Sequence, residues 1–304
     1  MSRTHEIQIA GPAVRADRAD GPMVRDLLDV LVEGSQGAAR FALEGRSTAS
    51  GPTPWWARDA RHFALLTSPR ADVIRVEALT LREIDPDRFH QGDLFKDFDP
   101  DRSAIDLFEE GLADAITGVA DSDHFDDGLV KTYENLEALF RDGAESVEFI
   151  NGRRLKVEQN GVEQVKRLRR QTPPDQATRT AGKLDAIRHS DRQFTLMLAG
   201  GGVIRGVADD FGRLKELVGR QVAVQGRAVF KPSGAPLRIE AERIELATEV
   251  DLRLFGRAPS SHARNLDLRE LRRQQGPRSG INAIIGQWPG DESDEEFARA
   301  VAAL

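Results

Sequence analysis

Residues 193–208 read QFTLMLAGGGVIRGVA, two apolar runs of strand length separated by the three glycines Gly200–Gly202. A glycine-rich turn between two such runs is typical of strands that pair side by side. Outward from this stretch, the pattern predicts a preceding strand at 178–188, and a following helix at 210–217 and strands at 220–230 and 236–246. Three strands, a helix and two strands is the element order of an OB-type barrel, with an SH3-like barrel or a curled sheet as the alternative.

The predicted barrel has glycines inside its strands and few aromatic residues. Gly182, Gly206 and Gly226 interrupt strand patterns, as expected where small closed barrels need bends or bulges. Barrels that bind single-stranded nucleic acids stack bases on aromatic side chains. Only three aromatic residues fall within these strands and loops, and none is Tyr or Trp: Phe194, Phe211 and Phe230. The composition therefore favours a structural or protein-binding barrel over one that binds nucleic acid.

The chain as far as Arg170 mixes hairpins and helices. The clearest hairpin is SVEFINGRRLKVE at 146–158, because Asn151-Gly152 supplies the positive φ values of a two-residue turn. The hydrophobic pattern predicts further strands at 5–9, 63–67 and 73–79, and helices at 22–43, 104–117 and 128–141. No strand–helix–strand rhythm runs through these elements, which indicates the α+β class.

The chain divides at a proline-rich segment. Residues 171–176, QTPPDQ, hold two prolines and no bulky apolar side chain, which is typical of a hinge. We therefore predict three parts: an acidic α+β domain at 1–170, a five-stranded OB-like β-barrel at 177–247, and a linker with an amphipathic tail helix at 248–304.

Charge is distributed unevenly along the chain. Residues 1–150 hold 16 basic and 30 acidic side chains, a net of −14, whereas residues 151–290 hold 26 and 15, a net of +11. The segment 291–304 has a net charge of −4. This pattern favours contact between oppositely charged parts of the chain. The alternative is a basic face for nucleic acid, with the acidic end imitating phosphate.

Composition excludes several classes of protein. The chain has no cysteine, so disulfides, thiolate zinc sites and thiol nucleophiles are excluded. No apolar run approaches the ~18 residues that cross a bilayer. Charged residues lie within Met1–Asp20, where a signal peptide would have its apolar centre. We expect a cytoplasmic bacterial protein with no membrane contact.

The densest polar cluster is DSDHFDD, spanning Asp121–Asp127. Its carboxylates and one imidazole are ligand types for a hard divalent cation, but the spacing does not fit an EF-hand loop. A solvated turn in which Asp126 or Asp127 caps the next helix is the favoured interpretation. No HExxH or GxSxG motif occurs. We therefore predict no catalytic residue, metal ligand or cofactor, and keep an enzyme with a dispersed site around this cluster as a third hypothesis.

The segment Trp288–Leu304, WPGDESDEEFARAVAAL, has the pattern of a short capped helix. Ser293 and Glu296 stand at capping-box spacing, and acidic residues crowd the first turn. A helix of about three turns is marginal alone in water, so its apolar stripe needs a surface. We predict that the tail binds a partner protein through Trp288, Phe297, Val301 and Leu304.

The segment Gly286–Glu296, GQWPGDESDEE, resembles the C-termini of small bacterial antitoxins encoded beside PIN-domain ribonuclease toxins. The body also resembles an uncharacterised bacterial family that ends in a small barrel and this tail. The resemblance implies a PIN-type toxin as the protein partner. The acidic tail would then contact the basic rim around the nuclease site, and its apolar residues would fill a groove.

Two functions follow from these patterns. The first is a non-enzymatic protein-interaction module, antitoxin-like, that binds a partner nuclease through its tail. The alternative is a nucleic-acid-binding protein that uses the barrel together with the basic residues of 153–170: Arg153, Arg154, Lys156, Lys166, Arg167, Arg169 and Arg170. A steep inverse dependence of binding on salt would distinguish the alternative from the first function.

Overall fold

The computed structural model describes residues 2–261 apart from 13, 50–51, 87–98, 152, 189–191, 210–211 and 213. Its first part, the sheet region (Arg3–Gln171), contains one antiparallel sheet in the order β2-β3-β1-β4-β5. The strands are β1 (Arg3–Ala10), β2 (Phe63–Leu66), β3 (Val73–Ala78), β4 (Ser146–Asn151) and β5 (Arg153–Val157). The predicted strands at 5–9, 63–67 and 73–79 and the predicted 146–158 hairpin are thus present.

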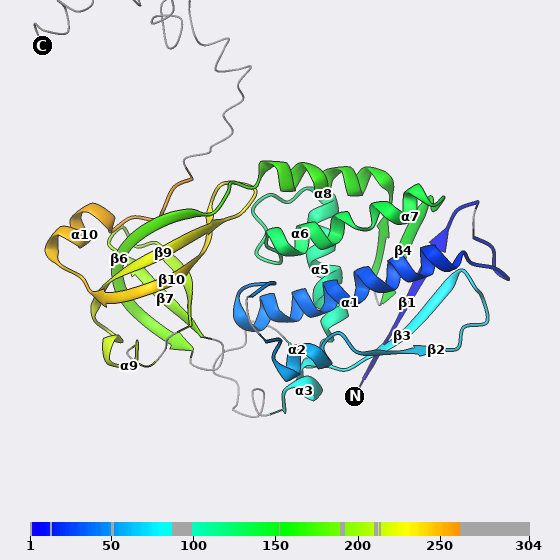
Figure 1. The fold of residues 1–304 in the computed structure, drawn as a ribbon, viewed down its shortest axis with the longest axis horizontal. Helices are drawn as coiled ribbons and strands as arrows, with labels where there is room; N and C mark the ends of the chain where they lie inside the picture. Colours follow the sequence, from blue (N-terminus) through cyan, green and yellow to red (C-terminus); the bar gives the residue numbers. More distant parts are fainter. Residues whose placement is uncertain are drawn as a thin grey trace, which may run out of the picture. The chain divides into compact units, whose positions relative to one another are not determined.

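Helices pack over this sheet (Figure 1). They are α1 (Gly21–Glu44), α2 (Trp55–Asp59), α3 (Leu81–Ile84), α5 (Ala104–Thr117), α6 (Asp127–Glu134), α7 (Glu137–Arg141) and α8 (Gln159–Gln171). The sequence predicts one helix at 128–141, whereas the structure has two. The Leu136 amide donates to Tyr133 O, three residues back, at 3.1 Å. This tighter turn brings both side chains to the interior, where each is 0% exposed.

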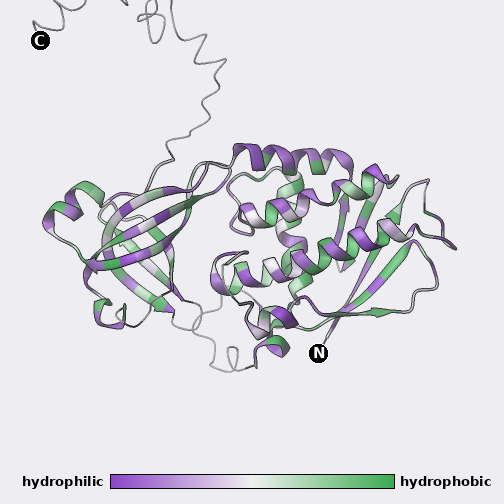
Figure 2. Ribbon diagram, in the orientation of Figure 1, coloured by the Kyte–Doolittle hydropathy of each residue, from purple (hydrophilic) through white to green (hydrophobic). Residues whose placement is uncertain are grey.

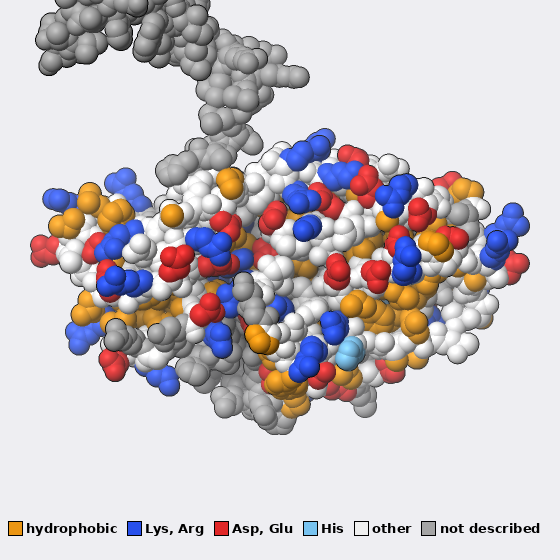
Figure 3. All heavy atoms as spheres, in the orientation of Figure 1, with side chains coloured by type: hydrophobic (Ala, Val, Ile, Leu, Met, Phe, Trp, Pro, Cys, Tyr) orange, Lys and Arg blue, Asp and Glu red, His pale blue; other side chains and the backbone are white. Residues whose placement is uncertain are grey.

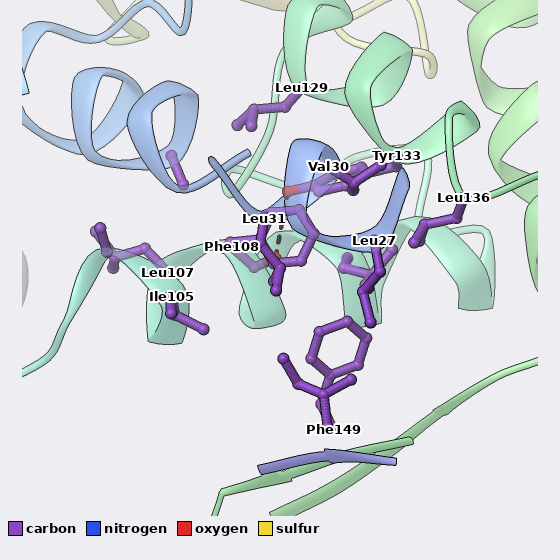
Figure 4. Packing of buried hydrophobic residues seen from close by; sticks show 14 of the residues in the cluster. Leu27, Val30, Leu31, Ile105, Leu107, Phe108, Leu129, Tyr133, Leu136 and Phe149 are labelled. Atoms are coloured by element: carbon purple, nitrogen blue, oxygen red, sulfur yellow. Dashed lines mark hydrogen bonds between the residues drawn. The ribbon is translucent and has the colours of Figure 1, made fainter. Parts of the chain in front are cut away.

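The core of the sheet region forms where α1, α5 and α6 meet the sheet. Phe149 points from β4 toward Leu27 and Leu31 of α1 (Figure 4). Phe108 of α5 lies 6.0 Å from Phe149 and 5.3 Å from Tyr133, measured between ring centroids. The edge-on geometry with Tyr133 is one that aromatic pairs prefer.

Gly34 permits the close crossing of α1 and α5. A Cβ built there would lie 2.3 Å from two carbons of the Phe108 ring. Gly34 and Gly37 both lower the helix propensity of the 22–43 segment. At Gly34 the close packing of Phe108 compensates for that loss.

The second part is a closed five-stranded barrel with the strand order β10-β8-β7-β6-β9. Its strands are β6 (Gln176–Arg188), β7 (Gln193–Leu198), β8 (Val203–Ala208), β9 (Gln221–Phe230) and β10 (Pro236–Leu246). Neighbouring strands pair antiparallel except β8 and β10, which are parallel. The helix α9 (Leu214–Leu217) follows β8, and α10 (Glu249–Phe255) follows β10. The fold is therefore α+β with a five-stranded barrel, as predicted.

Hydrophobic and hydrophilic residues alternate along the barrel strands (Figure 2), and on β7 buried residues alternate with more exposed ones. The interior is filled by apolar residues, among them Leu184, Leu196, Val224 and Ile239, each 0% exposed. Gly226 lies where β9 and β10 approach most closely, because a Cβ there would be 2.0 Å from Glu240 O. Gly182 and Gly226 thus permit close backbone contact, whereas a Cβ at Gly206 would lie 2.0 Å from the Phe194 ring.

The sheet region and the barrel belong to one unit, Met1–His262. The predicted tail helix lies outside the described residues. In the part of the chain that the structure describes, none of the helices combines the length and the apolarity that crossing a bilayer requires.

Candidate ligand site on the barrel face

The outer face of β7 and β8 carries polar and exposed residues. Across β7 and β8, Thr195 lies opposite Arg205, and Met197 lies opposite Val203. Arg205 and Val203 are exposed, whereas Val207, further along β8, is only 4% exposed. Val207 is less exposed because the sheet region covers that end of the face.

The C-terminal end of α1 makes the first contact with this face. The Gln193 side-chain amide donates to Leu43 O at 3.2 Å, and Arg46 forms an ion pair with Asp209 at 2.9 Å. Gly45 ends the helix with φ 72°, a left-handed conformation that glycine adopts without strain. A Cβ at Gly45 would lie 3.4 Å from the Gln193 side chain and 3.5 Å from Val207. The helix end therefore rests directly on β7 and β8.

The acidic cluster Asp121–Asp127 makes the second contact. Lys231, in the turn between β9 and β10, reaches Asp121 O and the Asp123 carboxylate, each at 3.0 Å. Ser233 donates from its hydroxyl to the Asp121 carboxylate at 3.0 Å. The barrel turn thus neutralises carboxylates that the sequence offered as metal ligands. The described residues contain no group of three or more side chains placed to hold a metal ion.

Asp126 joins the two parts of the chain in a buried position. Its carboxylate caps α6 by accepting from the Leu129 amide, as predicted, and also accepts from the Ser47 amide at 3.0 Å. Arg238 of β10 pairs with the same carboxylate at 3.2 Å, and the side chains of Arg238 and Asp126 are only 8% and 4% exposed. Removing one partner of such a buried pair leaves an uncompensated charge, which makes this contact hard to break.

A pocket of about 320 Å³ lies between these two contacts. One wall is basic and comes mostly from the barrel, with Arg188, Arg205 and Arg238, and with Arg102 from the sheet region. The other wall is largely apolar and comes from α1 and α5. Its residues are Ala38, Phe41, Ala42 and Leu107. Glu110, Asp123 and His124 complete the polar lining, so arginines outnumber carboxylates by four to two.

The arginines of the pocket differ in how far they are neutralised. Arg238 is held by Asp126 and by Glu240 at 3.0 Å, and Arg102 pairs with Glu110 at 2.7 Å. Arg205 is exposed and makes no ion pair with any residue that the structure describes. Arg205 is therefore the lining arginine whose charge is most available to a ligand.

His124 stands at the pocket with its ring fixed by a carboxylate. Its Nδ1 lies 2.8 Å from Asp114, and its Nε2 lies 3.8 Å from Glu110. Ser122 donates to the same Asp114 oxygen at 2.7 Å. Because Ser122 is bonded to the carboxylate and not to the imidazole, this group lacks the arrangement that activates a serine nucleophile. His124 is instead placed to exchange hydrogen bonds with a ligand.

A second histidine has a Ser-His-Glu arrangement but no access to solvent. His5 Nε2 lies 2.9 Å from Ser103 Oγ, and Nδ1 lies 3.3 Å from Glu109. Burial raises the pKa of the Glu109 carboxyl above its usual value, and its bond to His5 opposes that rise. Ser103 is 0% exposed and caps α5 by accepting from the Asp106 amide at 3.2 Å. This cluster fixes the start of α5 and has no room for a substrate.

The predicted basic segment is largely paired with acids. Lys156 contacts Glu158 at 2.5 Å, Lys166 contacts Glu137 at 2.5 Å, and Arg169 pairs with Glu134. The first two contacts raise the pKa of each lysine, because the carboxylates stabilise the charged form. Arg154 lies 3.7 Å from Glu148.

Arg167 and Arg170 are exposed, whereas the Arg153 side chain lies outside the described residues. Figure 3 shows acidic and basic side chains interleaved over the face that carries α8. Acidic side chains therefore stand beside four of these seven positions: Arg154, Lys156, Lys166 and Arg169.

The predicted partner-binding residues Trp288, Phe297, Val301 and Leu304 lie outside the described residues, so their role stays a prediction. Sequence patterns did not indicate the pocket, because its lining comes from segments far apart in the chain. Phe41, Arg102, His124 and Arg205 each stand in an ordinary helix, loop or strand pattern. Comparison of the chain with protein families, with curated proteins and with solved structures found no match.

Proposed function

We propose that this protein is a binding protein for a small phosphate-bearing ligand, which it holds in the pocket between the barrel face and α1. The observation that carries this proposal is Arg205, an exposed arginine that makes no ion pair within the described residues and lines a pocket that two parts of the chain build together. Guanidinium groups bind phosphate through charge-assisted, often paired hydrogen bonds.

The barrel supports the same proposal. An OB-type Greek-key barrel has three features that this barrel shares. Its first three strands form a meander, a helix precedes the fourth strand, and the third and fifth strands pair in parallel. Barrels of this type bind their ligands on the face of the second and third strands. Here those strands are β7 and β8, and Gln193, Arg205 and Val207 on them line the pocket.

Arg205→Ala tests the proposal without disturbing the core, because the side chain is exposed. We expect the affinity for inorganic phosphate and ribose 5-phosphate, measured by calorimetry, to fall at least about tenfold, since a charge-assisted hydrogen bond contributes about 1.5–3 kcal/mol. The control is Arg220→Ala, another exposed barrel arginine that does not line this pocket. Equal affinity for wild type and Arg205→Ala, or no phosphate binding at all, would refute the proposal.

Binding of a partner protein through the tail is a separate proposal, supported by the capped, amphipathic sequence of Trp288–Leu304. A PIN-type nuclease is the partner that its resemblance suggests. Binding of single-stranded nucleic acid by the 153–170 segment also stays a proposal. Its support is the pair of exposed arginines Arg167 and Arg170 on α8.

A further inference from the structure

We infer that the ligand of this pocket is a free nucleotide, with its phosphate toward Arg205 and its base toward Phe41. This inference rests on the proposed function and names the chemical class of the ligand. It follows from the chemistry of the two walls, from the source of the aromatic ring and from the closure of the pocket at both ends.

One wall of the pocket is apolar and the other is basic, which matches the flat base and the anionic phosphate of a nucleotide. Ala38, Phe41 and Ala42 stand at i, i+3 and i+4 on α1 and present one continuous apolar strip to the pocket. Arg205 and Arg188 stand on the barrel strands that form the other wall. A ligand with a flat apolar group at one end and an anion at the other would satisfy both walls, whereas a bare phosphate would leave the apolar strip uncovered.

The aromatic ring that a base needs comes from α1. Proteins bind bases by stacking them on aromatic side chains. On the described part of the barrel, Phe194 and Phe230 are both 2% exposed, so neither presents a ring face on which a ligand could stack. Phe41 is half-buried and lines the pocket, and it packs against the core of the sheet region on its other side. The sheet region thus supplies the stacking surface that the barrel lacks.

Two polar side chains of the sheet region also line the pocket. His124 and Glu110 both line the pocket, with the imidazole ring held by Asp114 at 2.8 Å. A carboxylate accepts hydrogen bonds from hydroxyl groups, and an imidazole nitrogen accepts or donates according to its tautomer. These two side chains are therefore suited to the two hydroxyl groups of a ribose.

Closure of the pocket favours a single nucleotide over a strand. On one side, Gln193 is bonded to Leu43 O and Arg46 to Asp209. On the other side, Arg238 pairs with Asp126 and Lys231 with Asp123. A polynucleotide that followed the barrel face would have to displace these contacts. A volume of about 320 Å³ is also at the lower end of the range for small-molecule pockets, roughly 300–1,000 Å³.

The test compares AMP, UMP, adenosine, ribose 5-phosphate and single-stranded oligonucleotides of increasing length as ligands of the full chain. We expect the nucleotides to bind at least tenfold more tightly than adenosine or ribose 5-phosphate, and oligonucleotides to bind no more tightly as they lengthen. Phe41→Leu keeps an apolar side chain and removes the ring. It should abolish the advantage of AMP over ribose 5-phosphate and leave the affinity for ribose 5-phosphate unchanged. Phe63→Leu, in β2 and absent from the pocket lining, is the matched control.

Each contrary outcome has a distinct meaning. Equal, Arg205-dependent binding of AMP and ribose 5-phosphate would overturn the nucleotide inference and leave the phosphate-binding function intact. Affinity that rises steeply with oligonucleotide length would overturn it in favour of a nucleic-acid strand. Failure of every phosphate-bearing probe to bind would overturn both the inference and the proposed function.

Discussion

At the scale of single residues, close contacts in this protein depend on a few side chains that are small or charged. Gly34 admits the Phe108 ring against the backbone of α1, and Asp126 accepts bonds from Ser47, Leu129 and Arg238. Neither role is visible in the local sequence. A glycine inside a helix predicts only lost helix propensity, and an aspartate before a helix predicts only a cap. Their further partners lie 74 and 112 positions away along the chain, Phe108 from Gly34 and Arg238 from Asp126.

Gly34→Ala is expected to destabilise the protein although alanine is the better helix former. The new Cβ would lie 2.3 Å from Phe108, so α1 and α5 must separate or the ring must move. Overpacking of this kind costs about 1–3 kcal/mol, which exceeds the gain of roughly 1 kcal/mol in helix propensity. Chemical denaturation measures the difference. Gly21→Ala, at an end of α1 where no atom lies within 4 Å of the new Cβ, should be neutral or slightly stabilising. A more stable Gly34→Ala protein would contradict the crossing described here.

At the scale of elements, α10 is joined to the barrel by one arginine. Arg179 of β6 donates to Asp251 at 2.9 Å and to Glu245 at 3.1 Å, and its guanidinium lies 5.9 Å from the centre of the Phe255 ring. Thr248 and Asp251 also form the capping box of this seven-residue helix. A helix so short depends on such contacts, because its own hydrogen bonds do not stabilise it in isolation.

Acid should loosen α10 over a defined range of pH. The bond from Arg179, and then the bonds from Thr248, lower the pKa of Asp251 from 3.8 to about 2. Because the pKa is lower in the folded state, the stabilisation is fully present above pH 3.8 and is lost as the pH falls through 2. The difference in melting temperature between wild type and Asp251→Asn should therefore be constant above that range and shrink on further acidification. Asp185→Asn, at an exposed position of β6, serves as the control. A difference that does not change with pH would show that the charge of Asp251 is not responsible.

Elements with a strong local pattern could be predicted from the sequence, and the site could not. The two apolar runs within 193–208 and the strands expected at 220–230 and 236–246 match β7, β8, β9 and β10 to within a residue or two, because alternating apolar residues and glycine turns act locally. The break between α6 and α7 was missed, since it depends on burying Tyr133 and Leu136 together. The pocket was missed for a related reason. Packing of the sheet region on the barrel is what brings Phe41 to Arg205.

At the scale of the whole molecule, the uneven charge of the sequence is used in contacts between the sheet region and the barrel. Lys231 and Arg238 of the barrel pair with carboxylates of the acidic cluster, and Arg46 of the sheet region pairs with Asp209. The pairs made by Lys231 and Arg238 join the basic part of the chain to the acidic part, as the charge pattern favoured, whereas the pair of Arg46 with Asp209 has the opposite polarity. Less positive charge is therefore left for an outside polyanion than the sequence alone suggests.

Removal of residues 287–304 should separate the proposed role of the tail from the stability of the rest of the chain. We expect a nearly unchanged melting temperature and loss of binding to a PIN-type nuclease, because a helix of about three turns is marginal by itself and its apolar stripe is proposed to need a partner surface. Trp288→Ala and Phe297→Ala should each weaken that binding by about 2 kcal/mol or more if they are central anchors. The dissociation constant can be measured by surface plasmon resonance, with the nuclease attached to the surface and each variant in solution. A large fall in melting temperature would instead indicate that the tail packs against the rest of the same chain.

The ion pairs made by Lys231 and Arg238 have a practical consequence for anyone who expresses the barrel by itself. Cut free from residues 1–171, the strands would present Lys231 without Asp121 and Asp123, and Arg238 without Asp126. Such a fragment would carry Lys231 without the carboxylates that neutralise it in the intact chain, and Arg238 with Glu240 as its remaining partner. Its retention on heparin or DNA resins would then report the excision of the fragment rather than a property of the native protein.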